Sequence, residues 1–279
     1  MRTEDTVEVS FIPGRKGQLF AMHRPPEKIG PHSECFVLAP SFAEEMNRCR
    51  YMCTLLAQGI TKHGHGYLSV DPYGTGDSAG EFVDANWETW CEDLIAACDY
   101  ARTLGYSRIT LFGIRIGALL VLDVAERITQ LQRIILWQPV ISGKTALTQF
   151  LRIRIAASLD REESGGTVAD FEKELDAGQP IQVAGYDVSP ALYRSIQAAS
   201  LENHLDFKAV PVAWFNTLAS ADRKTPQFEA SFLERWRKEN LRIKHFTVIG
   251  PSYWAVHERT LAPTLVDATV EYAAEGATI

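Results

Sequence analysis

An alternation of short apolar runs with amphipathic stretches constrains this chain more than any other feature. The apolar runs have the length of buried strands, and the stretches between them carry apolar residues at helical spacing. Predicted strands cover residues 7–13, 18–22, 35–39, 67–70, 108–112, 133–137, 210–215 and 243–249. Predicted helices cover residues 46–58, 86–104, 118–128, 227–238 and 261–272. The alternation predicts an α/β fold whose mostly parallel, eight-stranded sheet has helices on both faces.

The segment 142–205 interrupts this alternation, because it contains helical pieces but no further strand–helix pair. One helix is expected to begin at Ser189-Pro190, since serine caps helices and proline suits their first turn. We therefore expect a core of residues 1–141 and 206–279 and an inserted helical cap of residues 142–205. The cap would cover the carboxyl ends of the strands, where sheets of this kind bind ligands.

The composition argues against nucleic-acid binding and against a membrane span. The 279 residues include 28 Lys and Arg against 35 Asp and Glu, a formal net charge of −7, and no basic block stands out. This balance argues against binding to nucleic acid. The most apolar stretch, residues 109–124, is interrupted by Arg115 and Asp123, so no membrane span is expected.

The cysteines and the polar N-terminus bear on location. Five cysteines are an odd number in a chain of this length, and the first eight residues do not resemble a signal peptide. These features predict reduced thiols and a cytoplasmic location. No cofactor is predicted. No metal site is predicted either, because His63 and His65 lie in a loop without a nearby acidic partner.

A sharp turn is predicted where the strand at 108–112 meets the next helix. Residues 112–117 read Phe-Gly-Ile-Arg-Ile-Gly, so Gly113 and Gly117 flank Arg115. This is the spacing of the nucleophile elbow G-x-S-x-G, whose glycines permit a tight turn and close packing of helix on strand. The middle residue, which is serine in that motif, is Arg115 here.

Three further segments follow predicted strands in a familiar order. Residues 71–78 form a D-x-x-G-x-G-x-S turn, residues 222–226 read D-x-x-x-P, and residues 250–254 read Gly-Pro-Ser-Tyr-Trp. Together with the elbow, they resemble the α/β-hydrolases along almost the whole chain. The resemblance implies an α/β-hydrolase fold in which the elbow supplies the nucleophile, Asp222 the acid and the loop after the last strand the histidine.

A narrower resemblance rests on three features. Residues 40–47 read Pro-Ser-Phe-Ala-Glu-Glu-Met-Asn, Arg115 stands at the elbow, and residues 250–254 carry the pattern given above. Together they resemble the exosortase A system-associated hydrolases of the second type. Those are bacterial proteins linked to exopolysaccharide production and to the sorting of exported proteins, so the resemblance implies that context here.

The arginine at the elbow changes the chemistry that the fold family implies. A serine attacks because a neighbouring imidazole removes its proton, whereas a guanidinium stays protonated and cannot attack a carbonyl. Tyr253 or Trp254 stands where the histidine is expected, and His257 follows three or four residues later. Only Asp222 is left in its expected place. A standard acyl-enzyme mechanism at position 115 is therefore excluded.

Position 115 also predicts an anion site. It begins a helix, whose free N–H groups and dipole favour anions, and the guanidinium adds charge and donors. A buried guanidinium needs a carboxylate partner, for which Glu44, Glu45 and Asp222 are candidates. We expect an ion pair with Glu44 or Glu45, because both follow the strand whose loop overhangs the elbow.

The candidate residues fall into two groups. Candidates for catalysis are Arg115, Asp222, His257, Glu44 and Glu45. Candidates for ligand binding are Arg115, Ile116, Ser41, Phe42, Tyr253 and Trp254. Three roles stay open: the ion pair plugs a degenerate catalytic site, Arg115 orients a carboxylate or phosphate, or a glutamate activates water for hydrolysis.

Three classes of function follow from these roles. The first is an atypical hydrolase or transferase acting on an ester, thioester or amide, with water or a displaced nucleophile. The second is a non-catalytic relative, a pseudoenzyme, that binds an anionic small molecule. The third is a scaffold that docks a protein partner through the cap. The missing serine and histidine favour the second class, since fold alone does not define function.

Overall fold

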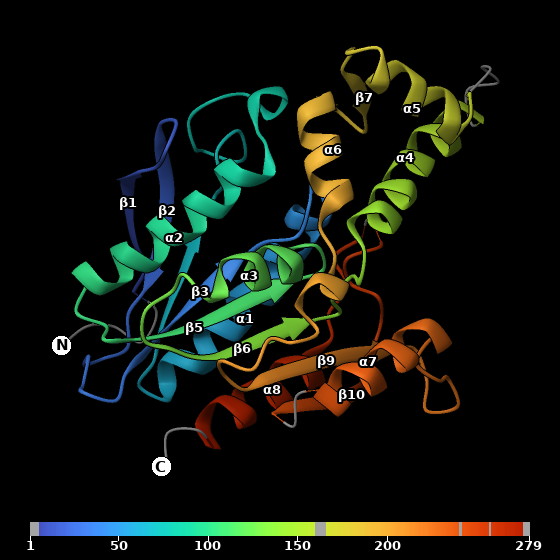
Figure 1. Ribbon diagram of the computed structural model, residues 1–279. Coiled ribbons are helices and arrows are strands. Elements are labelled where there is room, and N and C mark those ends of the chain that lie inside the picture. Colours follow the sequence, from blue (N-terminus) through green and yellow to red (C-terminus); the bar gives the residue numbers. More distant parts are fainter. Residues whose placement is uncertain (1–5, 160–165, 240–241, 257, 276–279) are drawn as a thin grey trace.

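An eight-stranded sheet forms the centre of the molecule (Figure 1). The structure is a computed structural model that describes residues 6–159, 166–239, 242–256 and 258–275. The strands are β1 (Glu8–Pro13), β2 (Gln18–Arg24), β3 (Glu34–Ala39), β4 (Gly66–Val70), β5 (Arg108–Ile114), β6 (Leu131–Trp137), β9 (Val212–Leu218) and β10 (Ile243–Ile249), in the spatial order β1-β2-β4-β3-β5-β6-β9-β10. β2 pairs antiparallel with β1 and β4, and the other pairs are parallel. The predicted mostly parallel, eight-stranded sheet is confirmed.

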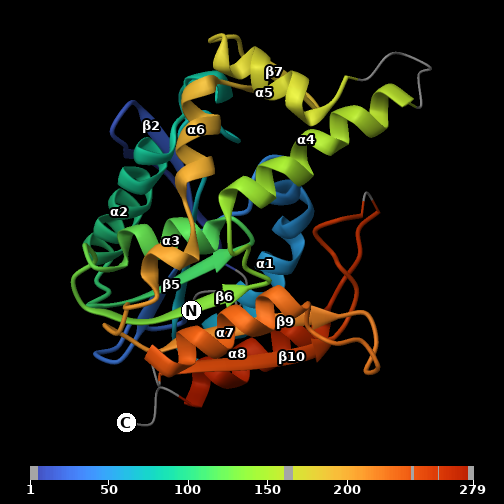
Figure 2. The same ribbon diagram turned by 45° about the vertical axis from the view of Figure 1, so that its right-hand side comes forward.

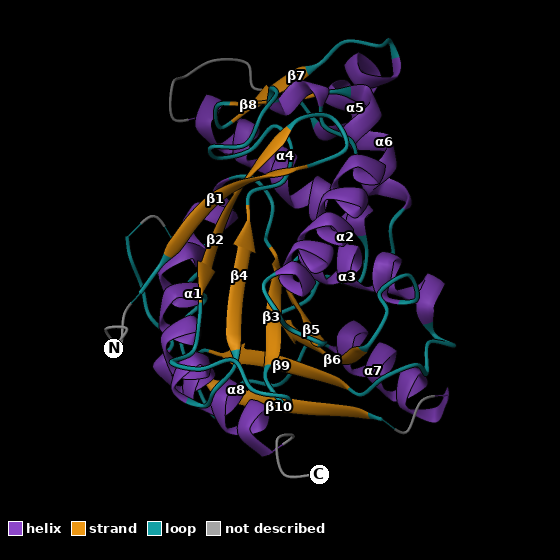
Figure 3. Ribbon diagram, turned by 90° about the vertical axis from the view of Figure 1, so that its left-hand side faces the viewer, coloured by secondary structure: helices purple, strands orange, loops and turns teal. Residues whose placement is uncertain are grey.

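Helices cover both faces of this sheet (Figures 1 and 3). They are α1 (Glu44–Lys62), α2 (Trp87–Thr103), α3 (Gly117–Ala125), α7 (Gln227–Glu239) and α8 (Pro263–Glu275), with a short 3-10 turn, η1 (Phe82–Asp84), before α2. Buried residues of α2, α3 and α7 pack on one face, and those of α1 and α8 on the other. In β3, Cys35 and Val37 face the first layer while Phe36 and Leu38 face the second, as the period of two in a strand requires.

The segment between β6 and β9 rises above the end of the sheet where β5 and β6 terminate (Figures 1 and 2). It contains α4 (Gly143–Leu159), α5 (Val168–Asp176), the hairpin β7 (Ile181–Val183) and β8 (Tyr186–Val188), α6 (Pro190–Ala198) and η2 (Leu201–His204). The predicted helix start is confirmed, because Ser189 accepts a hydrogen bond from the backbone N–H of Leu192 at 3.1 Å. The hairpin adds to the predicted helical pieces, since three-residue strands are too short to show a period.

One carboxylate ties this segment to the sheet layer below. Asp123 in α3 bonds His204 Nε2 in η2 through Oδ1 and accepts from Trp87 Nε1 at the start of α2 through Oδ2, both at 2.6 Å. The backbone N–H of Gly143 also donates to the carbonyl of Ala199 at 2.9 Å. The segment is therefore held where the chain leaves the core and where it returns.

All five cysteines are free and buried. Within the described ranges, no helix combines the length and the apolar character needed to cross a bilayer. In the same ranges, no three His, Cys, Asp or Glu side chains are arranged so that they could hold a metal ion.

Candidate functional site

The turn between β5 and α3 has the geometry of a nucleophile elbow. Arg115 has a φ of +55°, in the left-handed region that side-chain-bearing residues rarely adopt. Such a conformation costs about 1–3 kcal/mol and clusters at functional sites. A Cβ at Gly113 would lie 2.9 Å from Ala118 Cα, and one at Gly117 would lie 2.1 Å from the Ala39 carbonyl oxygen. Close packing therefore requires both glycines, and the turn presents Arg115 at its apex.

The Arg115 guanidinium is paired with Glu45. Arg115 Nε donates to Glu45 Oε1 at 3.3 Å and to Oε2 at 3.2 Å, and Glu45 lies in the first turn of α1. The Arg115 side chain is 13% exposed and that of Glu45 is 30% exposed, so the pair is largely shielded from water. The predicted ion pair between Arg115 and one of the two glutamates is confirmed, with Glu45 as the partner.

Two further contacts orient the guanidinium. Arg115 Nη1 donates to the backbone carbonyl of Gln138 at 3.3 Å, and Arg115 Cζ lies 5.2 Å from the centre of the Trp254 ring, a cation–π contact. In the part of the chain that the structure describes, Arg115 Nη2 donates to no protein acceptor. The two N–H groups on Nη2 thus remain available to an acceptor in the pocket that Arg115 lines.

The surroundings of Glu45 shift its protonation. Burial raises the pKa of Glu45 above its ordinary value and outweighs the opposing effects of Arg115 and Arg48. A carboxyl group with a raised pKa beside a cation, in a pocket, is typical of a functional site. The same group could also accept or donate a proton in a reaction.

Glu44 turns away from Arg115. Its Oε1 accepts hydrogen bonds from the Tyr186 hydroxyl at 3.0 Å and from Asn47 Nδ2 at 3.4 Å. Burial and the hydrogen bond to Glu44 raise the pKa of Tyr186 to about 12. Because Tyr186 belongs to β8, Glu44 connects α1 to the segment above the sheet. Glu45 instead pairs with Arg115 at the elbow.

A pocket of about 340 Å³ lies over Arg115. Its apolar walls include Phe42, Ile116, Trp254 and, from α4, Leu147 and Phe150. The rings of Phe42 and Phe150 meet edge to face, with centroids 4.9 Å apart. Its charged residues are Glu44, Glu45, Arg48 and Arg115, so formal charges balance. Four of the six predicted ligand-binding residues line this pocket: Arg115, Ile116, Phe42 and Trp254.

The other two predicted ligand-binding residues lie behind it. Ser41 is 4% exposed, and its side chain lines a separate cavity on the sheet side of α1. Tyr253 is 1% exposed, and its ring packs edge-on against Trp137 and Trp254. Phe42 and Trp254 therefore line the pocket over Arg115, whereas Ser41 and Tyr253 do not.

Of the predicted triad positions, the structure describes Arg115 and Asp222. Asp222 lies exposed in the loop after β9, where a hydrogen bond with Ser220 lowers its pKa, and it makes no contact with Arg115 among the described residues. Asp222 is thus corrected as a partner for Arg115, because its spacing after β9 does not determine where the loop turns. His257 lies outside the described residues.

Two residues that the sequence did not single out shape the site. Arg48 Nη1 donates to the carbonyls of Trp254 and Ala255, at 3.4 and 3.1 Å, and so fixes the loop after β10. Gln138 has a φ of +43° and accepts the Thr217 N–H at 2.8 Å through Oε1. The position of Arg48 one helical turn after Glu44 and Glu45 was a usable signal. No feature of the sequence indicated a role for Gln138.

Comparisons with known proteins indicate the same fold. Residues 30–165 match the family described as serine aminopeptidase, S33. Est1E from Butyrivibrio proteoclasticus, solved with ferulic acid, superposes with a TM-score of 0.64 at 20% identity over 95% of this chain and 96% of that chain. Proline iminopeptidase from Mycobacterium smegmatis superposes with a TM-score of 0.63 at 14% identity, over 97% of this chain and 99% of that chain.

The α/β hydrolase GrgF from a Penicillium species gives a TM-score of 0.65 at 15% identity over 98% of this chain and 100% of that chain. No curated protein matches the chain. At these identities the likeness is one of fold, and it extends over nearly the whole chain, including the segment above the sheet.

Proposed function

This chain has the α/β-hydrolase fold, and we propose that its pocket over Arg115 binds an anionic small molecule without forming an acyl-enzyme. The observation that carries the proposal is the guanidinium at the apex of the elbow. Arg115, which lines the pocket, is anchored through Nε and Nη1, and Nη2 donates to no acceptor among the residues that the structure describes. A guanidinium held in this way can bind one edge of a carboxylate or phosphate.

The walls of the pocket supply the second half of the recognition. Phe42, Phe150 and Trp254 present aromatic surface next to the cation. Ligand pockets combine apolar walls with a few polar groups that fix orientation. The expected ligand therefore has an apolar, ring-sized body and one anionic group. We take residues 142–205 as a cap that closes over this ligand and that could also receive a protein partner.

The biological context is part of the same proposal. The motif at residues 40–47, Arg115 and the loop at residues 250–254 are the features that resemble exosortase A system-associated hydrolases. They support a bacterial, cytoplasmic protein that serves exopolysaccharide production or protein sorting. In this reading the protein recognises a metabolite or carrier group of that system rather than cleaving it.

Thermal shift with defined anions tests the proposal. Benzoate and phenyl phosphate should raise the melting temperature of the wild-type protein, and the neutral analogue benzamide should not. The double variant Arg115→Met/Glu45→Gln removes both charges together and should abolish the shift. Arg152→Met, an exposed arginine on α4, is the matched control and should keep it. Equal shifts in the double variant and the wild type would contradict the proposal.

A second candidate is hydrolysis of an ester, thioester or amide in which Glu45 activates a water molecule. The raised pKa of Glu45 beside the elbow favours it. Turnover of short-chain aryl esters that is lost in Glu45→Gln and kept in Glu44→Gln would support it. Labelling of one serine by an organophosphonate would instead indicate a displaced nucleophile. Either result would replace the binding function by an enzymatic one.

A further inference from the structure

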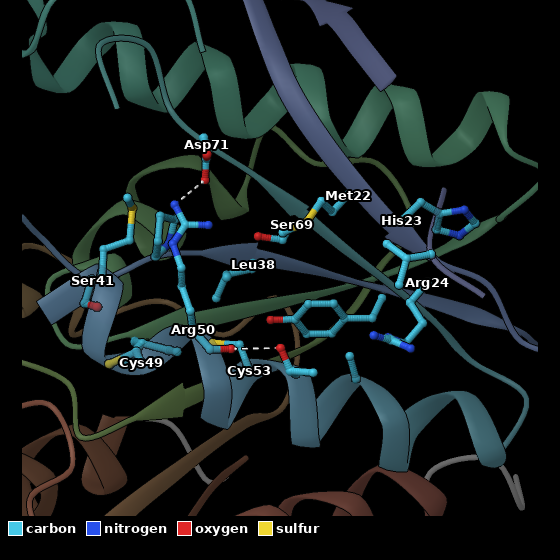
Figure 4. A pocket seen from close by; sticks show the side chains of 17 residues that line it. Met22, His23, Arg24, Leu38, Ser41, Cys49, Arg50, Cys53, Ser69 and Asp71 are labelled. Atoms are coloured by element: carbon cyan, nitrogen blue, oxygen red, sulfur yellow. Dashed lines mark hydrogen bonds and ion pairs between the residues drawn. The ribbon is translucent and has the colours of Figure 1, made fainter. Parts of the chain in front are cut away.

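A second cavity, of about 240 Å³, lies between α1 and the strands β2, β4 and β3 (Figure 4). It shares no lining residue with the pocket over Arg115. Figure 4 shows Ser41 toward one end and Arg24 toward the other, with Leu38 and Ser69 between them. The cavity is therefore a separate, elongated space, and what it binds does not depend on the function proposed above.

The cavity exists because α1 presents small side chains to the sheet. Cys49, Cys53 and Ala57 line it and recur every four residues, so they form one stripe on the helix. On the opposite side, Met22 of β2 and Leu38 of β3 supply apolar surface. The small stripe keeps the two layers apart, and the space between them is mostly apolar.

Ser69 places one hydroxyl in the middle of this space. In β4 it is the one residue that is not fully buried, although β2 and β3 cover the strand on both sides. Its exposed surface therefore faces the cavity, which its side chain lines. Among the described residues, Ser69 Oγ has no hydrogen-bond partner. An oxygen in the cavity could bond Ser69 without displacing a group of the protein.

Two other hydroxyls of the wall do not compete for an occupant. Those of Ser41 and Tyr67 are fully buried and interact with the thiols of Cys49 and Cys53, respectively. Burial raises the pKa of both thiols, so they stay uncharged. This part of the wall is thus neutral and closed.

The charged residues of the cavity already have partners. Arg50 Nη2 donates to Asp71 Oδ1 at 3.1 Å, an ion pair that Figure 4 shows. At the other end, His23 and Arg24 likewise interact with groups of the chain. A charged occupant would have to break one of these interactions or stay unpaired, and burying an unpaired charge is costly. The charges therefore favour an uncharged occupant.

We propose that this cavity binds a neutral aliphatic molecule that carries one oxygen, such as a medium-chain alcohol or ketone. An apolar cavity of about 150 Å³ holds benzene, so 240 Å³ corresponds to about nine or ten non-hydrogen atoms. Met22, Leu38 and Met46 contact the chain, and methionine adapts to flexible apolar ligands. The Ser69 hydroxyl bonds the oxygen. A water molecule is held less well there, because it needs two or more polar partners and Ser69 pairs with Met22 and Leu38.

Titration calorimetry on the whole chain with octan-1-ol and propylbenzene tests this assignment. The two probes match in size, and only the alcohol carries an oxygen, so both should bind. Ser69→Ala should weaken octan-1-ol binding about fivefold, as expected for one lost hydrogen bond, and leave propylbenzene binding unchanged. Ser231→Ala, at an exposed position of α7, is the matched control and should change neither affinity.

A second variant locates the site. Ala57→Leu fills the space and should abolish binding of both probes, with the melting temperature and circular dichroism confirming that the variant folds. It should leave unchanged the rise in melting temperature that benzoate causes. Arg115→Met/Glu45→Gln should in turn leave octan-1-ol binding unchanged. If Ala57→Leu does not fold, the mild substitution Ser69→Ala still decides the outcome.

Four results would contradict the proposal. No binding at millimolar octan-1-ol would overturn it, as would equal octan-1-ol affinities in the wild type, Ser69→Ala and Ala57→Leu. An equal loss of both probes in Ser69→Ala would overturn the hydrogen bond to the ligand oxygen. Octanoate that binds as tightly as octan-1-ol would overturn the assignment of a neutral ligand.

Discussion

Arg115 and Glu45 form a contact that any anionic ligand must share. A ligand anion on Arg115 Nη2 would lie close to the Glu45 carboxylate, which Arg115 Nε holds at 3.2 Å. Two anions on one cation repel each other, and protonation of Glu45 removes that repulsion. The state of this single carboxyl group therefore controls how well the elbow receives an anion.

Anion binding should consequently depend on pH. Since burial raises the pKa of Glu45, this group takes up a proton at a higher pH than an exposed glutamate does. Affinity for benzenesulfonate, which stays ionised throughout, should rise up to about tenfold as the pH falls from 7.5 to 5. Titration calorimetry measures this slope. Glu45→Gln should flatten it and Glu44→Gln should keep it, and an unchanged slope in Glu45→Gln would contradict the coupling.

The sequence predicted an ion pair for Arg115 but not which glutamate forms it. Successive residues on a helix project about 100° apart, so Glu44 and Glu45 face different neighbours. Which glutamate pairs with Arg115 depends on where α1 begins. Glu44 instead accepts a hydrogen bond from Tyr186, 142 residues later in the chain. Contacts over such distances are set by packing, which local patterns do not contain.

A second buried carboxyl group gives a stability prediction. Asp93 in α2 is 2% exposed, accepts the Tyr73 N–H at 2.8 Å through Oδ2, and leaves Oδ1 without a partner in the described structure. Burial raises the pKa of Asp93 to about 6. The folded state then binds a proton that the unfolded state has lost between about pH 4 and pH 6. The free energy of unfolding should fall as the pH rises through that window.

Asp93→Asn should remove this pH dependence. At pH 7 the substitution should stabilise the protein by about 1 kcal/mol, with about 3 kcal/mol as an upper limit set by the pKa shift, and at pH 4 it should have little effect. Urea unfolding at both pH values measures the difference. Asp267→Asn, at an exposed position of α8, is the control and should change neither value. Equal effects of Asp93→Asn at pH 4 and pH 7 would rule out a titrating Asp93.

At the level of elements, helix starts were predictable where a local hydrogen bond defines them. Ser189-Pro190 marked the beginning of α6 in sequence, and the structure has the cap at that residue. The cavity beside α1 was not predictable, because Cys49, Cys53 and Ala57 each read as ordinary buried residues. Their shared feature, small volume, matters only once β2, β3 and β4 stand opposite. Asp222 is the opposite case: its motif is present in the sequence, but in the structure its side chain is exposed.

The Ser189 cap should stabilise α6 locally. Ser189→Ala removes the acceptor for the Leu192 N–H and should cost about 1 kcal/mol. Hydrogen exchange should become faster at the first amides of α6, whereas exchange in α3 should not change. Ser189→Asn, which keeps an acceptor, should restore protection. Faster exchange in Ser189→Asn equal to that of Ser189→Ala would show that the side-chain cap does not stabilise the helix.

At the level of the whole molecule, the pocket over Arg115 depends on how the segment of residues 143–204 sits on the core. That segment supplies Leu147 and Phe150 to the pocket and Tyr186 to Glu44. Asp123 is the point at which α2, α3 and η2 meet, because it accepts from Trp87 and bonds His204. A change at Asp123 should therefore act on the pocket without touching it.

Asp123→Ala should loosen this attachment. The loss of two hydrogen bonds should cost about 2 kcal/mol and lower the melting temperature by about 4–8 °C. Hydrogen exchange should become faster across residues 190–204 and stay unchanged in β5. The rise in melting temperature that benzoate causes should become smaller, because the upper wall of the pocket is less ordered. Asp267→Ala serves as the exposed control. If exchange in residues 190–204 stays at the wild-type rate, Asp123 does not hold the segment in place, and the pocket must be ordered by the contacts of Glu44 and Phe42 instead.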